Sequence, residues 1–263
     1  MEIRHPIDPR LPGMLRSGER LRGVFNALPH PGIVEMCGYA GFDFVIIDNE
    51  HGSAGLETTE NMLRAARASG IVPIVRTFAP DIPRLLDMGA NAVQVPMVES
   101  AAQARALVQQ LRYPPLGRRG SAFSPRAAGY GAFPGASHTR LSNEGIALIA
   151  MIETPEACAQ AAEIAAVDGV DAVFVGPNDL SHAMGFGSDW RAQPVADAIE
   201  QALRAIAGAG KCAGTIALAP EDEERYAAFG ARFFAGVTTS IITQAFQRAA
   251  GAGRNLGRAS PPG

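Results

Sequence analysis

The sequence predicts an α/β protein with the architecture of a TIM (β/α)8 barrel. Eight short runs rich in Val, Ile and Phe recur along the 263 residues, and longer Ala-rich amphipathic segments separate them. A single barrel commonly fills about 250 residues. A doubly wound open sheet alternates in a similar way, but it more often has about five to seven strands and a phosphate-binding loop after the first. We therefore expect one barrel domain over residues 1–263, with a loose tail rich in Gly, Arg and Pro at 251–263.

The predicted strands are the apolar runs at 21–25, 44–47, 72–76, 92–96, 147–152, 172–175, 212–216 and 233–236. Helical segments between them include 57–69, 101–112, 155–165, 195–207 and 221–229. Gly70, Gly89, Gly208 and Gly230 stand near the ends of such segments, where glycine caps are typical. The even spacing breaks at 113–145, which is rich in Pro and Gly. We interpret this segment as an active-site loop on the catalytic face, and a mobile linker is the alternative.

Composition excludes several classes of function. The 23 basic and 26 acidic residues leave a net charge of only -3, which gives no electrostatic support for a nucleic-acid or membrane-surface partner. Residues 1–16 contain no apolar signal segment, and no apolar run reaches the roughly 18 residues that a membrane span needs. Cys37, Cys158 and Cys212 form no CxxC pair and are odd in number, which favours a reducing cytoplasm over a disulfide framework. Neither a Walker loop nor a dinucleotide fingerprint is present.

Polar residues directly follow several predicted strands, at the barrel end where function gathers. They are Asp48, Asn49, Glu50 and His51 after the second strand, Arg76 at the end of the third, Glu153 after the fifth, and Asp179 after the sixth. Because neighbouring strand ends stand about 5 Å apart, Glu153 and Asp179 can converge on one divalent cation. Two carboxylates plus waters suit Mg²⁺ or Mn²⁺. The alternative is that both acids cap the helices that follow them.

His51 and Arg76 are candidates for catalytic roles. His51 follows two acids in a turn, where a nearby anion such as Asp48 can raise its basicity as a general base requires, or it is an ordinary surface histidine. Arg76 closes an apolar strand and suits the stabilisation of an enolate oxygen, or it forms a structural salt bridge.

Lys211 is the only lysine among the basic residues, and the others are arginine. A metal-free barrel aldolase needs a Schiff-base lysine at the C-terminal half of a strand, whereas Lys211 precedes the seventh strand. A carbon–carbon lyase with this sequence must therefore stabilise its enolate with a metal.

Six stretches closely resemble the HpcH/HpaI aldolase family, in order and over nearly the whole chain. They are DFVIIDNEH (43–51), VPIVR (72–76), LLDMGANAVQVPMVES (85–100), YPPLGRRG (113–120), IAMIETPEA (149–157) and VDAVFVGPNDLSHAMG (170–185). The resemblance implies a barrel of the phosphoenolpyruvate/pyruvate type that cleaves a 4-hydroxy-2-oxo acid to pyruvate and an aldehyde. It also implies dependence on Mg²⁺, Mn²⁺ or Co²⁺, and a homohexamer formed by exchange of the last helix.

The resemblance also implies roles for individual residues. Glu153 and Asp179 would bind the metal, His51 would act as base through a metal-bound water, and Arg76 would stabilise the pyruvate enolate. Asp87 would raise the basicity of His51, a role that its position in an ordinary helix end does not suggest. The backbone of residues 176–179, which are Gly176, Pro177, Asn178 and Asp179, would hold the keto-acid carboxylate.

Two departures from the family pattern bear on aldehyde specificity. Met151 stands where family members often have a substrate-binding Gln, and Thr238 follows the last strand in a region where an Asp is frequent. Two rival functions are a malyl- or citramalyl-coenzyme-A lyase, which usually has a further C-terminal segment, and a non-catalytic ligand-binding barrel.

Overall fold

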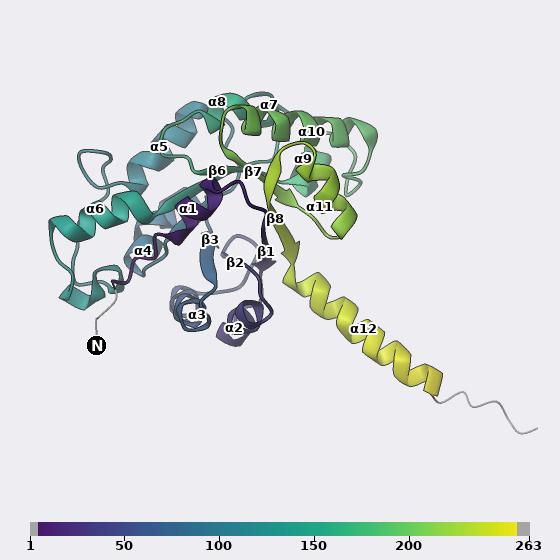
Figure 1. The fold of residues 1–263 in the computed structure, drawn as a ribbon, viewed down its shortest axis with the longest axis horizontal. Helices are drawn as coiled ribbons and strands as arrows, with labels where there is room; N and C mark the ends of the chain where they lie inside the picture. The colour runs from purple at the N-terminus through teal and green to yellow at the C-terminus, as the bar shows by residue number, and fades with distance from the viewer. Residues whose placement is uncertain (1–4, 257–263) are drawn as a thin grey trace, which may run out of the picture.

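The computed structural model describes residues 5–256, which form a closed barrel of eight parallel strands surrounded by helices (Figure 1). The strands are β1 (Leu21–Asn26), β2 (Phe44–Asp48), β3 (Val72–Arg76), β4 (Ala92–Val95), β5 (Ala147–Ile152), β6 (Ala172–Val175), β7 (Cys212–Ile216) and β8 (Ala231–Val237). Each strand pairs with the next one along the chain, and β8 closes the barrel by pairing with β1. The predicted TIM barrel is confirmed, and each predicted strand lies within two residues of the observed one.

The helices lie outside the barrel or at its ends. They are α1 (Arg10–Arg16), α2 (Pro31–Tyr39), α3 (Leu56–Ser69), η1 (Ala79–Asp81), α4 (Ile82–Asp87), α5 (Ala101–Leu111), η2 (Arg126–Gly131), α6 (Ala136–Gly145), α7 (Pro155–Ala159), α8 (Ala161–Ala165), α9 (Pro177–Ala183), α10 (Gln193–Gly208), α11 (Pro220–Ala227) and α12 (Thr238–Leu256). In the described residues, no helix combines the length and apolar character that crossing a bilayer requires.

Aromatic side chains fill the barrel interior. The rings of Phe44 and Phe233 stack with centroids 4.3 Å apart, and Phe174 meets Phe233 edge-on at 5.8 Å. Leu11 and Leu15 of α1 belong to the same buried cluster. Helix α1 therefore closes the end of the barrel at which the strands begin, and the polar side chains that follow the strands gather at the other end.

The segment 113–145 does not lie on the catalytic face of its own barrel, where an active-site loop was expected. The segment contains η2 and α6, and it connects α5 to β5, so it reaches the end of the barrel where strands begin. Buried Tyr113 anchors it, because the Asn143 side chain accepts a hydrogen bond from the Tyr113 amide at 2.7 Å and donates one to its carbonyl at 3.2 Å. Tertiary contacts thus order a stretch whose Pro and Gly content indicated a loop.

Other differences concern helix ends. Gly70, Gly89 and Gly230 have the expected positive φ, but Gly208 is the last residue of α10 and does not, and Gly210 takes that conformation instead. The helix predicted at 155–165 is divided at Gln160 into α7 and α8. Helix α12 continues to Leu256, into the segment predicted as a tail, and residues 257–263 lie outside the described residues.

Candidate active site

Asp48 and Arg76 form a buried ion pair at the C-terminal ends of β2 and β3. The two residues are in register across these strands, and Arg76 donates from Nε to Oδ1 at 2.8 Å and from Nη2 to Oδ2 at 2.5 Å. Burial alone would raise the pKa of Asp48, but the hydrogen bonds and charge of Arg76 outweigh it and hold that pKa below its usual value. Asp48 also accepts the backbone N–H groups of Glu50 and His51, which shapes the turn after β2.

Glu50, one of the polar residues that follow the second strand, is a second partner of Arg76, a role that the sequence pattern did not indicate. Its Oε2 lies 3.1 Å from Arg76 Nη1 but makes no hydrogen bond. Burial, and then the negative charges of Asp48 and Asp179, raise the pKa of Glu50, while Arg76 and His51 act in the opposite direction. The salt-bridge interpretation of Arg76 therefore describes its contacts, and the guanidinium still lies at the end of the strand where an enolate-stabilising cation was expected.

Glu153 is a buried carboxylate at the end of β5. Its Oε2 accepts the backbone N–H of Met97 at 2.9 Å. Burial is the main cause that raises its pKa to about 7, and the charges of Asp179 and Glu50 raise it further against the effect of the Met97 hydrogen bond. Burying a negative charge near other carboxylates costs free energy, and a bound cation would lower that cost.

Helix capping does not explain Glu153. The N-cap of α7 is Thr154, whose hydroxyl oxygen accepts the Ala157 N–H at 3.1 Å. Asp179 lies exposed in the first turn of α9, which has no side-chain cap hydrogen bond. The negative charge of Asp179 is among the causes that raise the pKa of Glu153.

Gly176 is the residue that makes room for Glu153. A Cβ at this position would lie 2.7 Å from Glu153 Oε1 and 2.8 Å from Met151 Cε. Next to it, Pro177 and Asn178 begin α9, with Pro177 buried and Asn178 exposed. Residues 176–179 therefore pass directly beside the buried carboxylate.

Within residues 5–256, no group of three or more His, Cys, Asp and Glu side chains is placed to hold a metal ion. A metal site with two carboxylate ligands and water at the other positions is compatible with this result. Glu153 and Asp179 fit that role, since both supply oxygen ligands and leave coordination positions open. A cation bound there would offset the burial and the negative charges that raise the pKa of Glu153.

His51 and Asp87 do not meet within one chain. The His51 side chain is 63% exposed, and its Nε2 lies 3.8 Å from Glu50 Oε2. Asp87 ends α4, which leads to the start of β4, so it lies at the opposite end of the barrel. There it accepts a hydrogen bond from Arg119 Nη2 at 3.0 Å.

Gln94 is a polar residue inside the barrel that the sequence analysis missed. It is fully buried on β4, its Nε2 lies 3.1 Å from Met151 Sδ, and its Oε1 has no hydrogen-bond partner. In register it neighbours Arg76. The available signal was a glutamine within the otherwise apolar run Ala92–Val95.

Known proteins place this architecture in a family. The chain is 41% identical over 207 residues to a hydroxypyruvate/pyruvate aldolase of Delftia acidovorans, covering 77% of this chain and 76% of that protein. It is 39% identical to a 4-hydroxy-2-oxovalerate aldolase of Novosphingobium aromaticivorans, covering 77% and 78%. The structure of an HpcH/HpaI aldolase/citrate lyase family protein from Burkholderia cenocepacia is similar with a TM-score of 0.89 and 29% identity, covering 94% of this chain and all of that one. Residues 21–245 match the family model, and the chain belongs to the HpcH/HpaI aldolase/citrate lyase family.

Proposed function

We propose that this protein is a divalent-metal-dependent aldolase that reversibly cleaves a 4-hydroxy-2-oxo acid into pyruvate and an aldehyde. The observation that carries the proposal is the buried carboxylate of Glu153 beside Asp179 and Arg76 at the C-terminal end of the barrel. The names of relatives at about 40% identity, which are pyruvate and 4-hydroxy-2-oxovalerate aldolases, support it. It gives a role to Glu153, to Asp179 and to the cation Arg76 at the same end of the barrel.

Glu153 and Asp179 would hold Mg²⁺, Mn²⁺ or Co²⁺. When bound, the ion supplies a Lewis acid that polarises the keto group of the substrate. The backbone of residues 176–179 would hold the substrate carboxylate, because N–H groups at the start of α9 are free of intrahelical partners. Gly176 keeps this turn close to Glu153.

Arg76 would stabilise negative charge on the enolate oxygen of pyruvate. Its guanidinium is fixed by Asp48 and Glu50 and lies 4.7 Å above the ring of Phe25. A cation that is already oriented reorganises little as charge develops. The two carboxylates therefore position Arg76 before the reaction begins.

His51 would accept the proton of the substrate 4-hydroxyl group. The His51 side chain is exposed, so a substrate and a side chain from another copy of the protein can both reach it. Because Asp87 lies at the opposite end of its own barrel, we propose that the Asp87 that raises the basicity of His51 comes from a second copy of the chain.

We propose a homo-oligomer, and a hexamer from the family resemblance. Helix α12 projects away from the barrel (Figure 1), and its apolar side chains Ile241 and Phe246 are 46% and 71% exposed. A long helix with exposed apolar residues gains stability by packing on another copy. The buried, unpaired cysteines Cys37, Cys158 and Cys212 support a cytoplasmic location.

The proposal is tested by pyruvate release from 4-hydroxy-2-oxo acids, with and without chelator. Activity should disappear with chelator and return with Mg²⁺, Mn²⁺ or Co²⁺. Borohydride added with substrate should leave Lys211 unmodified, because its Nζ donates to the Val170 carbonyl at 2.6 Å, ahead of β6. A trapped Schiff base, or full activity in chelator, would refute the metal mechanism.

A further inference from the structure

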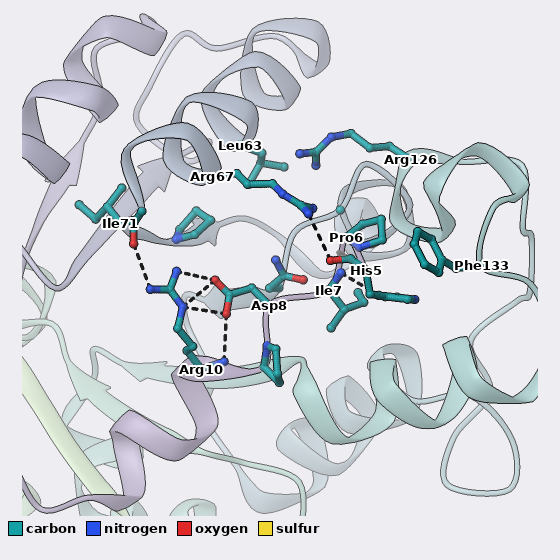
Figure 2. A pocket seen from close by; sticks show the side chains of 15 residues that line it. His5, Pro6, Ile7, Asp8, Arg10, Leu63, Arg67, Ile71, Arg126 and Phe133 are labelled. Carbon is teal, nitrogen blue, oxygen red and sulfur yellow. Dashed lines mark hydrogen bonds and ion pairs between the residues drawn. The ribbon is translucent and has the colours of Figure 1, made fainter. Parts of the chain in front are cut away.

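A cavity of about 710 Å³ lies at the end of the barrel opposite the candidate active site (Figure 2). Its walls include residues 5–10, the end of α3, and residues at the starts of β3 and β4. This volume is in the range of roughly 300–1,000 Å³ that is typical of small-molecule sites. Neither His51 nor Glu153 lines it, so the catalytic proposal does not account for it.

The charged lining of this cavity is predominantly positive. Arg10, Arg67 and Arg126 line it together with the acid Asp8, and Asp8 is already paired with Arg10 at 2.6 Å. Burial, followed by the positive charges of Arg64 and Arg67, lowers the pKa of Arg126. Figure 2 shows Arg67 and Arg126 reaching into the same region from different segments. An anion between these two guanidinium groups would offset their repulsion.

Asn91 supplies a second, independent indication of a ligand. It lines the cavity, only 5% of the residue is exposed, and its Oδ1 accepts no hydrogen bond. A buried acceptor without a donor is costly in a folded protein. A ligand that carries an O–H or N–H group would satisfy it.

One wall of the cavity lies outside the part of the chain that matches the family model. That match covers residues 21–245, whereas residues 5–10 form the wall next to Arg67. Arg67 Nη2 donates to the carbonyl of His5 at 3.4 Å, which ties this segment to α3. Ile7 and Phe133 add apolar surface. Residues 5–10, which precede the part of the chain that matches the family model, therefore help to form the cavity.

We propose that this cavity binds a small organic anion whose phosphate or carboxylate group pairs with Arg67 and Arg126. A hydroxyl or amino group of the same ligand donates to Asn91 Oδ1, and its carbon skeleton packs on Ile7 and Phe133. This site is distinct from the catalytic end of the barrel and does not depend on the aldolase proposal.

Calorimetric titration of the full chain in chelator tests the proposal with three probes: inorganic phosphate, glycerol 3-phosphate and glycerate. The chelator removes binding through a metal at the catalytic end. Glycerol 3-phosphate or glycerate should bind saturably. The probe that binds more tightly shows whether the site prefers a phosphate or a carboxylate group. Arg67→Glu should weaken binding at least about tenfold, because it reverses one of the paired charges. Arg204→Glu, at another exposed helical arginine, on α10 and away from the cavity, should leave binding unchanged.

Asn91→Ala should weaken the binding of glycerol 3-phosphate more than the binding of inorganic phosphate, because only glycerol 3-phosphate has a carbon-bound hydroxyl group. Thermal unfolding establishes that each variant is folded, and Arg67→Gln replaces Arg67→Glu if the charge reversal prevents folding. The proposal is overturned if no probe binds at millimolar concentration, or if the folded Arg67 variant binds as the parent does. Loss of binding in Asp179→Ala would also overturn it, since that result locates the ligand at the catalytic end.

Discussion

Arg76 contacts two carboxylates, and its replacement separates a catalytic from a structural role. Arg76→Ala should lower both pyruvate methyl-proton exchange and aldol cleavage by about 10² to 10³, because both need charge stabilisation on the enolate oxygen. It should also destabilise the fold by roughly 3–5 kcal/mol, because Asp48 stays buried without its partner. Rates are therefore measured per folded protein, by proton exchange in NMR and by pyruvate release. Parental exchange in folded Arg76→Ala would leave Arg76 with a structural role alone.

Gly176 is predicted to be required for the geometry of Glu153. In Gly176→Ala the new Cβ displaces the Glu153 carboxylate or the Met151 side chain, so the metal concentration for half-maximal activity should rise at least about tenfold. Gly208→Ala is the matched control, because nothing lies within 4 Å of a Cβ there and its φ is not positive. That variant should keep activity and gain up to about 1 kcal/mol of stability. Equal metal dependence in both variants would contradict the assignment of Glu153 as a ligand.

Thr154, the N-cap residue of α7, directly follows Glu153. The cap therefore connects the stability of α7 with the position of Glu153. Thr154→Ala removes the side-chain acceptor for the Ala157 N–H and should lower the free energy of unfolding by about 1 kcal/mol. Ser100→Ala, which removes the equivalent cap of α5, should cost a similar amount. Only Thr154→Ala should also raise the metal requirement, because only Thr154 fixes the backbone next to Glu153. Urea unfolding and metal titration measure the two effects, and an unchanged metal requirement would show that the cap acts on stability alone.

The assembled molecule is predicted to complete each active site with a residue from another copy. His51→Ala and Asp87→Ala should each be inactive alone, because one lacks the base and the other lacks the acid that supports it. When the two variants are dissociated, mixed and reassembled, activity should return to roughly a quarter of the parental value, as expected for reciprocal sites shared between pairs of copies. Mixed oligomers without activity would place Asp87 outside the site. Removal of residues 238–263 should abolish this recovery, since α12 is the proposed contact between copies.

Sequence patterns alone predict the barrel, which the structure confirms, and place the polar residues that follow its strands at one end. The spacing and length of the apolar runs were enough to predict the strands, because a buried parallel strand is a short apolar run. Polar residues that directly follow such runs lie at one end of the barrel. Asp48, Arg76, Glu153 and Asp179 were placed in this way. Their contact partners could be identified only in the folded barrel. It showed that Thr154 rather than Glu153 caps α7, and that Glu50 joins Asp48 on Arg76.

Side-chain packing between distant segments was also beyond the sequence pattern. The segment 113–145 has the composition of a loop, yet contacts such as that of Tyr113 with Asn143 order it. The sequence around Asp87 is typical of a helix end. Only the closed barrel shows that Asp87 and His51 lie at opposite ends of the barrel. The cavity beside Arg67 joins residues 5–10 to residues near 67, 91 and 126, which no local pattern connects. Local periodicity fixes secondary structure, whereas contacts between remote segments depend on closure of the barrel, because closure alone sets which strand ends and loops become neighbours.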